Sequence, residues 1–277
     1  MTATAATQIL EFLASPGPPV EAKVMIVVPH PDDETIGMGA QLCRFRDSLL
    51  VQLTDGAPRD GRDAAAHGFK TISDYAFARR VELYTALEAG LAAGLRTEFI
   101  GVPDQAAVLN LVPLTKALGL RLQAEAPEAI FVQPYEGGHP DHDAASFAVH
   151  CACQLIEVDG KTPPAVIEMT AYHSNPTGLA TGTFSTADQQ ITTLPLSPAD
   201  RSRKRRMIDC FYSQRELLAR FAIEFESFRE APAYDFTRPP HRGAIYYESL
   251  GWGINTKTWR QHAHSALCTL GLAPSCA

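Results

Sequence analysis

The sequence lacks the features that define several common classes of protein. It has no apolar run approaching the roughly 20 residues that a membrane span needs. It has no basic residue before Lys23 and no long apolar stretch at its start, so we expect no secretory signal and a cytoplasmic location. Positive charge is also scarce, since the formal net charge is −7 and nucleic-acid binders usually have a basic surface. We therefore expect neither a membrane nor a nucleic-acid partner.

The six cysteines do not have zinc-finger spacing. Cys43 and Cys151 fall in helical patterns, as small core residues do. Because no secretory signal is present, we interpret the cysteines as reduced thiols, with a Cys268–Cys276 pair as the alternative near the tail. The 277 residues suffice for one large α/β domain or two small ones.

A first cluster of reactive side chains follows an apolar run. Residues 24–28 read as a buried strand, and Pro29 and Pro31 then force a loop. Neighbouring carboxylates repel one another unless they share a positive charge, and a divalent metal is the simplest source. Histidine and carboxylate ligands with room for water are typical of catalytic zinc, although iron(II) fits the same ligands. The cluster consists of His30, Asp32, Asp33 and Glu34.

A second cluster, residues 139–143, follows another apolar run at 129–132. It contains His139, Asp141, His142 and Asp143. Loops at the exits of two parallel strands meet at the carboxyl edge of a sheet, where ligands bind in open α/β folds. We therefore expect one site at the carboxyl ends of the first and fourth strands.

Strands and helices alternate along the first two thirds of the chain. This predicts an α/β fold with a Rossmann-like, doubly wound, mostly parallel sheet of five or six strands. A helix over 75–90 would be capped by Asp74, and 57–74 reads as a long loop. The expected strands are about 23–28, 48–54, 97–102, 129–133 and 165–172, and the other helices about 35–47, 111–125 and 143–157.

Beyond residue 173 the pattern changes. We expect one domain over 1–277, with a core of about 23–173 and an accessory C-terminal part of about 174–277 packed over the carboxyl edge. A hairpin is expected within 174–198, and then a helix from Ser197 to about 225, with 201–206 on a solvated helix face rather than in an anion site. Four tail aromatics would fill the core or, alternatively, stack on a sugar: Tyr246, Tyr247, Trp252 and Trp259.

Together, the stretch 29–34 (PHPDDE) and the stretch 139–142 (HPDH) resemble the PIG-L/LmbE-like family of zinc-dependent N-deacetylases, which act on N-acetylglucosamine-type sugars. The resemblance is dense over about 23–150, visible to about 260 and absent from the ends. It implies that His30, Asp33 and His142 ligate zinc.

The same resemblance implies roles for three further residues. Asp32 would be the general base, and a protonated His139 would stabilise the oxyanion. Asp141 would orient His139, and a carboxylate beside an imidazole raises its pKa. Some members place a tyrosine two residues before the second motif, where this chain has Gly137. Further candidates for substrate contacts are Arg79, Arg80, Asp55, Asp104, Tyr135, Glu136 and His173.

The expected activity is removal of an N-acyl group, in the family an N-acetyl group, from an amino sugar or its glycoside. An amidase that cleaves a thiol conjugate or another non-sugar amide is the alternative, because the motifs build the hydrolytic centre and not the specificity pocket. A metal- or carbohydrate-binding protein without turnover would be expected to lose the base, and Asp32 is present. The sequence leaves a homo-oligomer open.

Overall fold

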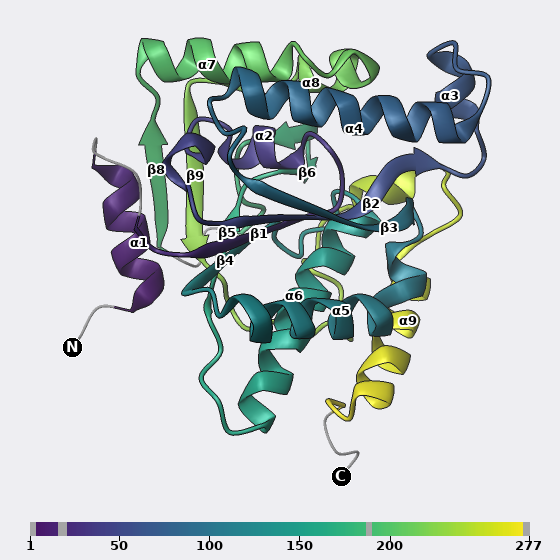
Figure 1. The fold of residues 1–277 in the computed structure, drawn as a ribbon. Helices are drawn as coiled ribbons and strands as arrows, with labels where there is room; N and C mark the ends of the chain where they lie inside the picture. The colour runs from purple at the N-terminus through teal and green to yellow at the C-terminus, as the bar shows by residue number, and fades with distance from the viewer. Residues whose placement is uncertain (1–3, 16–20, 187–189, 274–277) are drawn as a thin grey trace.

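A computed structural model describes residues 4–15, 21–186 and 190–273. Within these ranges the central sheet has seven strands in the order β3-β2-β1-β4-β5-β9-β8 (Figure 1). Its strands are β1 (Val24–Val28), β2 (Leu49–Pro58), β3 (Arg96–Asp104), β4 (Ala129–Val132), β5 (Ala165–Met169), β8 (Ile191–Pro195) and β9 (Phe225–Glu230).

The sheet is mostly parallel. The neighbouring strands β3, β2, β1, β4 and β5 pair in parallel, whereas β9 runs antiparallel to both β5 and β8. The strand order reverses between β1 and β4, and this reversal opens a crevice at the carboxyl edge. The predicted Rossmann-like fold is therefore confirmed, but the expected strand count of five or six is wrong, because β8 and β9 extend the sheet to seven strands.

Helices cover both faces of the sheet (Figure 1). Side chains of β1 alternate between two cores: Val24, Ile26 and Val28 pack with α2, α4 and α7, and Met25 and Val27 pack with α5, α6 and α9. This two-sided burial explains why the strand is a continuous apolar run. The helices are α1 (Ala5–Ala14), α2 (Asp33–Met38), α3 (Arg62–Ala66), α4 (Ile72–Ala89), α5 (Leu111–Glu125), α6 (Pro140–Val158), α7 (Pro198–Ile208), α8 (Arg215–Leu218) and α9 (Thr256–Leu270).

The first half differs from expectation near β2. The strand continues through the predicted turn at 55–56, and α3 lies within the predicted loop 57–74. Helix α4 starts earlier because Thr71, not Asp74, is its N-cap: the Thr71 hydroxyl accepts from the Asp74 amide at 3.0 Å. Helix α2 is shorter than predicted. Its last groups bond side chains from later elements, since Lys204 donates to the Ile36 carbonyl and Glu226 accepts from the Ala40 amide.

The C-terminal part differs more. The observed hairpin pairs β6 (Tyr172–Asn175) with β7 (Gly178–Thr181), so it starts before the expected range 174–198 and inside the predicted fifth strand. Strand β8 joins the main sheet through β9, which was not predicted. Ser197 caps α7 as predicted, but the helix ends at Ile208. The interpretation of 201–206 as a solvated face is wrong for Lys204, which is buried against Glu226.

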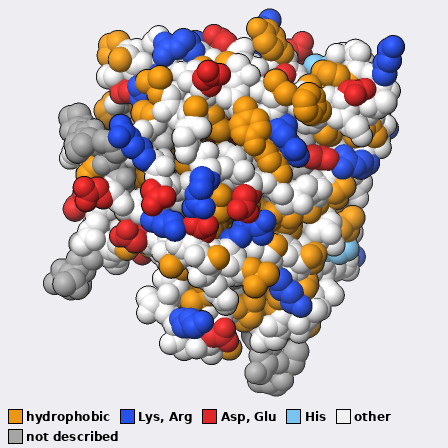
Figure 2. Space-filling model, in the orientation of Figure 1, with side chains coloured by type: hydrophobic (Ala, Val, Ile, Leu, Met, Phe, Trp, Pro, Cys, Tyr) orange, Lys and Arg blue, Asp and Glu red, His pale blue; other side chains and the backbone are white. Residues whose placement is uncertain are grey.

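One face of the molecule carries an apolar group of side chains. Phe77, Val81 and Tyr84 lie along α4 and are exposed, and Figure 2 shows hydrophobic side chains gathered over this helix. Acidic and basic side chains intermingle below them. In the described ranges, no helix combines the length and apolar character needed to cross a bilayer. The alternative pair Cys268–Cys276 includes a residue outside the described ranges.

Candidate functional site

Two loops meet at the carboxyl edge of the sheet. Strands β1 and β4 are parallel neighbours, so the loops that follow them lie side by side. The first loop carries His30 and leads into α2, which begins at Asp33. The second leads into α6, with His139 as its N-cap and Pro140 as its first residue, a position that suits proline because no intrahelical N–H is needed there.

The three expected metal ligands come together. One ligand atom each from His30, Asp33 and His142 lies within 4.8 Å of the others, and all three residues are buried. Asp33 bridges the histidines, with Oδ2 at 3.1 Å from His30 Nδ1 and Oδ1 at 3.1 Å from His142 Nε2. Although His142 Nε2 lies this close to Asp33, it makes no hydrogen bond of good geometry with any described residue. An unpartnered buried nitrogen beside a carboxylate and a second imidazole fits a divalent metal such as zinc.

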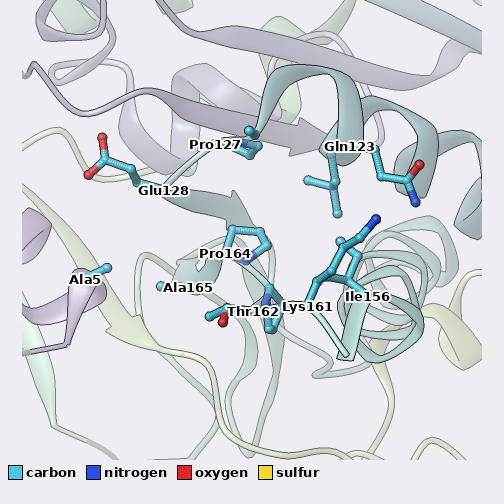
Figure 3. Close-up of a pocket in the computed structure, with 12 residues that line it drawn as sticks. Ala5, Gln123, Pro127, Glu128, Ile156, Lys161, Thr162, Pro164 and Ala165 are labelled. Carbon is cyan, nitrogen blue, oxygen red and sulfur yellow. The ribbon is translucent and has the colours of Figure 1, made fainter. Parts of the chain in front are cut away.

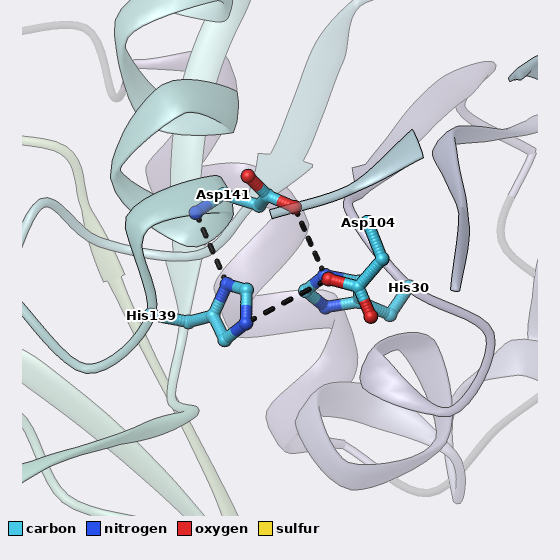
Figure 4. Close-up of side chains that lie close together, drawn as sticks. All are labelled: His30, Asp104, His139 and Asp141. Atoms are coloured by element: carbon cyan, nitrogen blue, oxygen red, sulfur yellow. Dashed lines mark hydrogen bonds and ion pairs between the residues drawn. The ribbon is translucent and has the colours of Figure 1, made fainter. Parts of the chain in front are cut away.

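A second set of groups shares His30 (Figure 4). His30 Nε2 lies 3.1 Å from Asp104 Oδ1 and 3.3 Å from Asp141 Oδ2. Asp104 ends strand β3, so three strands contribute to the site. Although burial alone would lower it, the surrounding carboxylates of Asp104, Asp141 and Asp33 raise the pKa of His30 well above its usual value.

His139 is oriented differently from expectation. Its Nδ1 accepts a hydrogen bond from the Asp141 backbone N–H at 3.1 Å, which places the ring proton on Nε2. The Asp141 carboxylate instead accepts from the Gln105 and Ala107 amides. Burial and the nearby His30 hold the pKa of His139 well below its usual value, opposite to the expected rise. His139 is therefore a neutral donor whose Nε2 lies 3.8 Å from Asp104 Oδ1 (Figure 4).

Asp32 lies beside the ligands in a strained backbone conformation. Its φ of 121° falls outside the regions that a side chain normally permits. Arg79 holds this turn, donating at 2.6 Å to the Pro31 carbonyl and at 3.2 Å to Asp32 Oδ2. Burial raises the pKa of Asp32 well above its usual range, against the opposing charge of Arg79. A carboxyl with a raised pKa is suited to accept and return a proton near neutrality.

Glu34 supports the loop from beneath. Its carboxyl accepts hydrogen bonds from Thr35 Oγ1 at 2.6 Å, from the Asp32 backbone N–H at 3.1 Å and from Gln52 Nε2 at 3.2 Å. Burial raises the pKa of Glu34 to about 7. It does not line the cavity described below.

Gly137 and Gly138 explain why no tyrosine precedes the second motif. Gly137 has φ +73°, and a Cβ there would lie 2.7 Å from Ile245 Cδ1. A Cβ on Gly138 would lie 1.9 Å from the Tyr172 carbonyl oxygen. The Tyr172 carbonyl therefore leaves no room for a side chain at position 138, and the positive φ favours glycine at position 137.

His30, Asp32, Asp33, His139 and His142 line a cavity of about 110 Å³. Of the expected substrate-contact residues, Arg79 and Asp104 line it. The sequence pattern did not single out the other lining residues as part of the site, because no local signal links them to the motifs. These are Ile36, Asp63, Gln105, Tyr172, Gln214, Leu217, Leu218 and Trp252.

Arg80, Asp55 and Tyr135 do not line this cavity. The Arg80 guanidinium lies over the Phe99 ring, and Asp55 pairs with Arg59 at 2.5 Å. Tyr135 donates to the Arg238 carbonyl and packs in an aromatic cluster with Trp259.

The remaining two candidates, Glu136 and His173, also lie outside the cavity lining. They are buried and face each other, with His173 Nδ1 3.5 Å from Glu136 Oε2. These positions place both side chains in the supporting structure behind the second motif.

A larger hollow of about 640 Å³ lies at the opposite, amino edge of the sheet (Figure 3). Ala5, Pro127, Pro164 and Ile156 contribute apolar surface, and Glu128 and Lys161 are its charged residues. It contains neither histidine nor cysteine among its lining residues, so it lacks the groups that make the smaller cavity the candidate active site.

Residues 25–153 match the family described as GlcNAc-PI de-N-acetylase (PIG-L). The matched segment runs from β1 to α6 and contains both clusters, whereas the cavity wall from Tyr172 onward lies outside it. No curated protein matches the sequence.

Solved structures share the fold. A triple mutant of the deacetylase of the teicoplanin biosynthetic pathway superposes with a TM-score of 0.57 at 18% identity, covering 77% of this chain and 99% of that one. The N,N'-diacetylchitobiose deacetylase from Pyrococcus horikoshii has a TM-score of 0.51 at 21% identity, covering 82% of this chain and 90% of that one. GalB, the 4-carboxy-2-hydroxymuconate hydratase from Pseudomonas putida, has a TM-score of 0.54 at 15% identity, covering 77% of this chain and 98% of that one. Because these proteins differ in activity, the likeness establishes the fold and not the reaction.

Proposed function

Residues 25–153 are a PIG-L family domain, and on that premise we propose that the protein is a metal-dependent hydrolase that removes an N-acetyl group from an amino sugar or its glycoside. The observation that carries the proposal is the convergence of His30, Asp33 and His142 within 4.8 Å beside the buried Asp32. The names of two similar structures, deacetylases of the teicoplanin pathway and of diacetylchitobiose, support the reaction class.

The ligand residues would hold one divalent metal, for which zinc is our first choice and iron(II) the alternative. When bound, such a metal lowers the pKa of water to about 7 and polarises a carbonyl. The protein supplies the rest. Burial of all three ligands and of Asp32 keeps bulk water away from the reacting groups, which strengthens every charge interaction there.

Asp32 is the proposed proton carrier. Its carboxylate takes a proton from the attacking water and returns it to the leaving nitrogen, so the amide and water become a carboxylate and an amine. Arg79 anchors this carboxylate at 3.2 Å and prevents it from turning away. His139 donates from Nε2 to the carbonyl oxygen as negative charge develops on it, because its Nδ1 is already engaged by the Asp141 amide.

Acyl release tests this proposal. Wild-type protein, loaded with zinc or with iron(II), would be assayed for acetate release from a panel of N-acetylglucosamine derivatives and ringless N-acetyl amides. Asp32→Asn should retain the metal but lose at least about a hundredfold in rate, the usual range for a general base. Asp55→Asn is the matched control, because Asp55 also lies near a strand end but outside the cavity.

The outcomes separate the alternatives. Release from sugar derivatives that depends on Asp32 supports the amino-sugar hydrolase. Acetate release only from the ringless amides would show that the proposed substrate class is wrong, while the proposed metal centre would stand. Equal activity of Asp32→Asn and wild type would refute the proposed base, and a protein that binds no metal after reconstitution would refute the centre.

A further inference from the structure

The reactive half of the cavity and its outer wall come from different parts of the chain. Helix α8, strand β6 and the segment before α9 provide much of the wall, and all three lie beyond the matched residues 25–153. Trp252 stands out in this wall because it is the one aromatic side chain there that is also substantially exposed, at 36%. The other wall aromatic, Tyr172, is buried.

Trp252 touches the centre with one part of its ring and solvent with another. Its ring centroid lies 4.8 Å from that of His139, with the two planes inclined at 58°. This contact fixes the indole at the mouth of the cavity, beside the proposed oxyanion donor. The exposed part of the indole thus forms an apolar surface next to the reacting groups.

Two glycines hold Trp252 in this place. Gly251 and Gly253 both have positive φ, 70° and 77°, which side chains rarely permit. A Cβ at either position would meet no atom within 4 Å. Glycine is therefore needed here for the backbone conformation that presents the indole, and not for close packing.

The cavity is too small for a whole sugar. Sites for drug-sized ligands usually measure about 300–1,000 Å³, whereas this cavity measures about 110 Å³. It has room for an acyl group and the amide that carries it, so the remainder of a substrate must lie outside, across the mouth. Among the lining residues Trp252 and Asp63 are exposed, and Gln105, Gln214 and Leu217 are partly exposed, so Trp252 offers the aromatic part of the accessible surface.

We propose that Trp252 is the specificity-determining platform of this site, on which the apolar C–H face of the acylated amino sugar stacks. The inference rests on the proposed function and names the part of the site that selects a ring over a linear amide. Asp63, which is exposed, offers a carboxylate to the ring hydroxyls at the same mouth. A planar indole suits a pyranose because both present an extended apolar face.

The decisive experiment compares two substrates. Methyl N-acetyl-β-D-glucosaminide carries a ring, and N-acetylethanolamine carries the same amide without one. We expect Trp252→Leu to lower kcat/KM about tenfold for the ring substrate, a loss typical of one aromatic contact, and to leave the ringless substrate nearly unchanged. Trp252→Phe should recover most of the loss, because it restores a flat face. Phe77→Ala, an exposed aromatic on α4 outside the cavity, is the control.

A purely structural role for Trp252 predicts another result. If the indole only positioned His139, Trp252→Leu would lower kcat/KM by the same factor for both substrates. Trp252→Phe would then also change kcat/KM for the two substrates equally. That outcome, or full activity of Trp252→Leu on the ring substrate, would overturn the platform.

Binding separates failure of the platform from failure of the proposed function. The chain has two tryptophans, and Trp259 is buried with its Nε1 donating to the Pro140 carbonyl. Saturable quenching of intrinsic fluorescence by the methyl glycoside, present in wild type and lost in Trp252→Leu, supports the platform even if no acetate is released. No quenching in wild type, with acetate release intact and independent of Trp252, overturns the platform alone.

Discussion

A buried ion pair ties the C-terminal part of the chain to the helix that carries the site. Lys204 of α7 and Glu226 of β9 are each about 1% exposed and lie 2.8 Å apart. Lys204 Nζ also donates to the Ile36 carbonyl at 2.8 Å, and Glu226 Oε1 accepts from the Ala40 amide at 2.9 Å. The pair therefore closes the end of α2, which begins at Asp33, one of the proposed metal ligands.

Lys204→Met should destabilise the protein strongly. It keeps the apolar stem of the side chain but leaves the Glu226 carboxylate buried without its cation, a change that costs about 3–5 kcal/mol. Lys204→Met with Glu226→Gln removes both charges, and the glutamine oxygen still accepts from the Ala40 amide. We expect the double variant to be about 2 kcal/mol more stable than Lys204→Met, since no unpaired charge remains.

Urea unfolding at equilibrium measures both differences. With a slope of about 3 kcal/mol per molar urea, Lys204→Met should lower the midpoint by about 1–1.7 M at unchanged slope. Arg205→Met is the matched control, because Arg205 is exposed on the same helix and should change stability by less than about 0.5 kcal/mol. The reasoning is refuted if Lys204→Met behaves like this control, or if adding Glu226→Gln recovers no stability.

Three further results are expected. Burial raises the Glu34 pKa to about 7, so the contribution of Glu34 to stability is fully present below about pH 4.5 and is lost as pH rises through 7. Glu34→Gln should therefore reduce the fall in the free energy of unfolding between pH 5 and 8, measured by urea unfolding. An unchanged fall would assign the pH dependence to other groups. Zinc should raise the melting temperature of wild type but not of His142→Ala, measured by calorimetry with and without chelator, and an equal rise in both would place the metal elsewhere. The free energy of unfolding of Asp32→Gly should be about 1–3 kcal/mol higher than that of Asp32→Ala, since only glycine relieves the strain at a φ of 121°. Equal free energies of unfolding would show that this turn is unstrained.

The convergence of the site residues could be predicted because it is encoded locally. His30 and Asp33 sit in one loop, and His139 and His142 in another, so two short motifs and the expectation of a parallel sheet suffice to bring them together. Strand β1 was equally readable, since burial on both faces requires an unbroken apolar run.

The errors arose where a distant segment decides the outcome. Helix α2 ends early because the Ile36 carbonyl and the Ala40 amide bond Lys204 and Glu226 instead of continuing the helix. The sequence around α2 contains no signal for these distant partners. The pKa expected for His139 had the wrong sign because burial and His30 outweigh the nearby carboxylates. The pairing of β9 with β5 is likewise set by tertiary contacts rather than by a local pattern.

The residues that local motifs predict and the residues that only tertiary contacts place have different proposed roles in the site. The segment 25–153 contains the proposed ligands and the proposed proton carrier, whereas residues from Tyr172 to Trp252 provide much of the cavity wall around them. Lys204 and Glu226 join the two parts, because they belong to the later segment yet fix the end of α2. Substitutions in the wall, away from this joint, should therefore change which amide is cleaved while leaving the hydrolytic chemistry intact. Substitutions at the joint should lower stability and activity together, since they loosen the helix on which Asp33 stands.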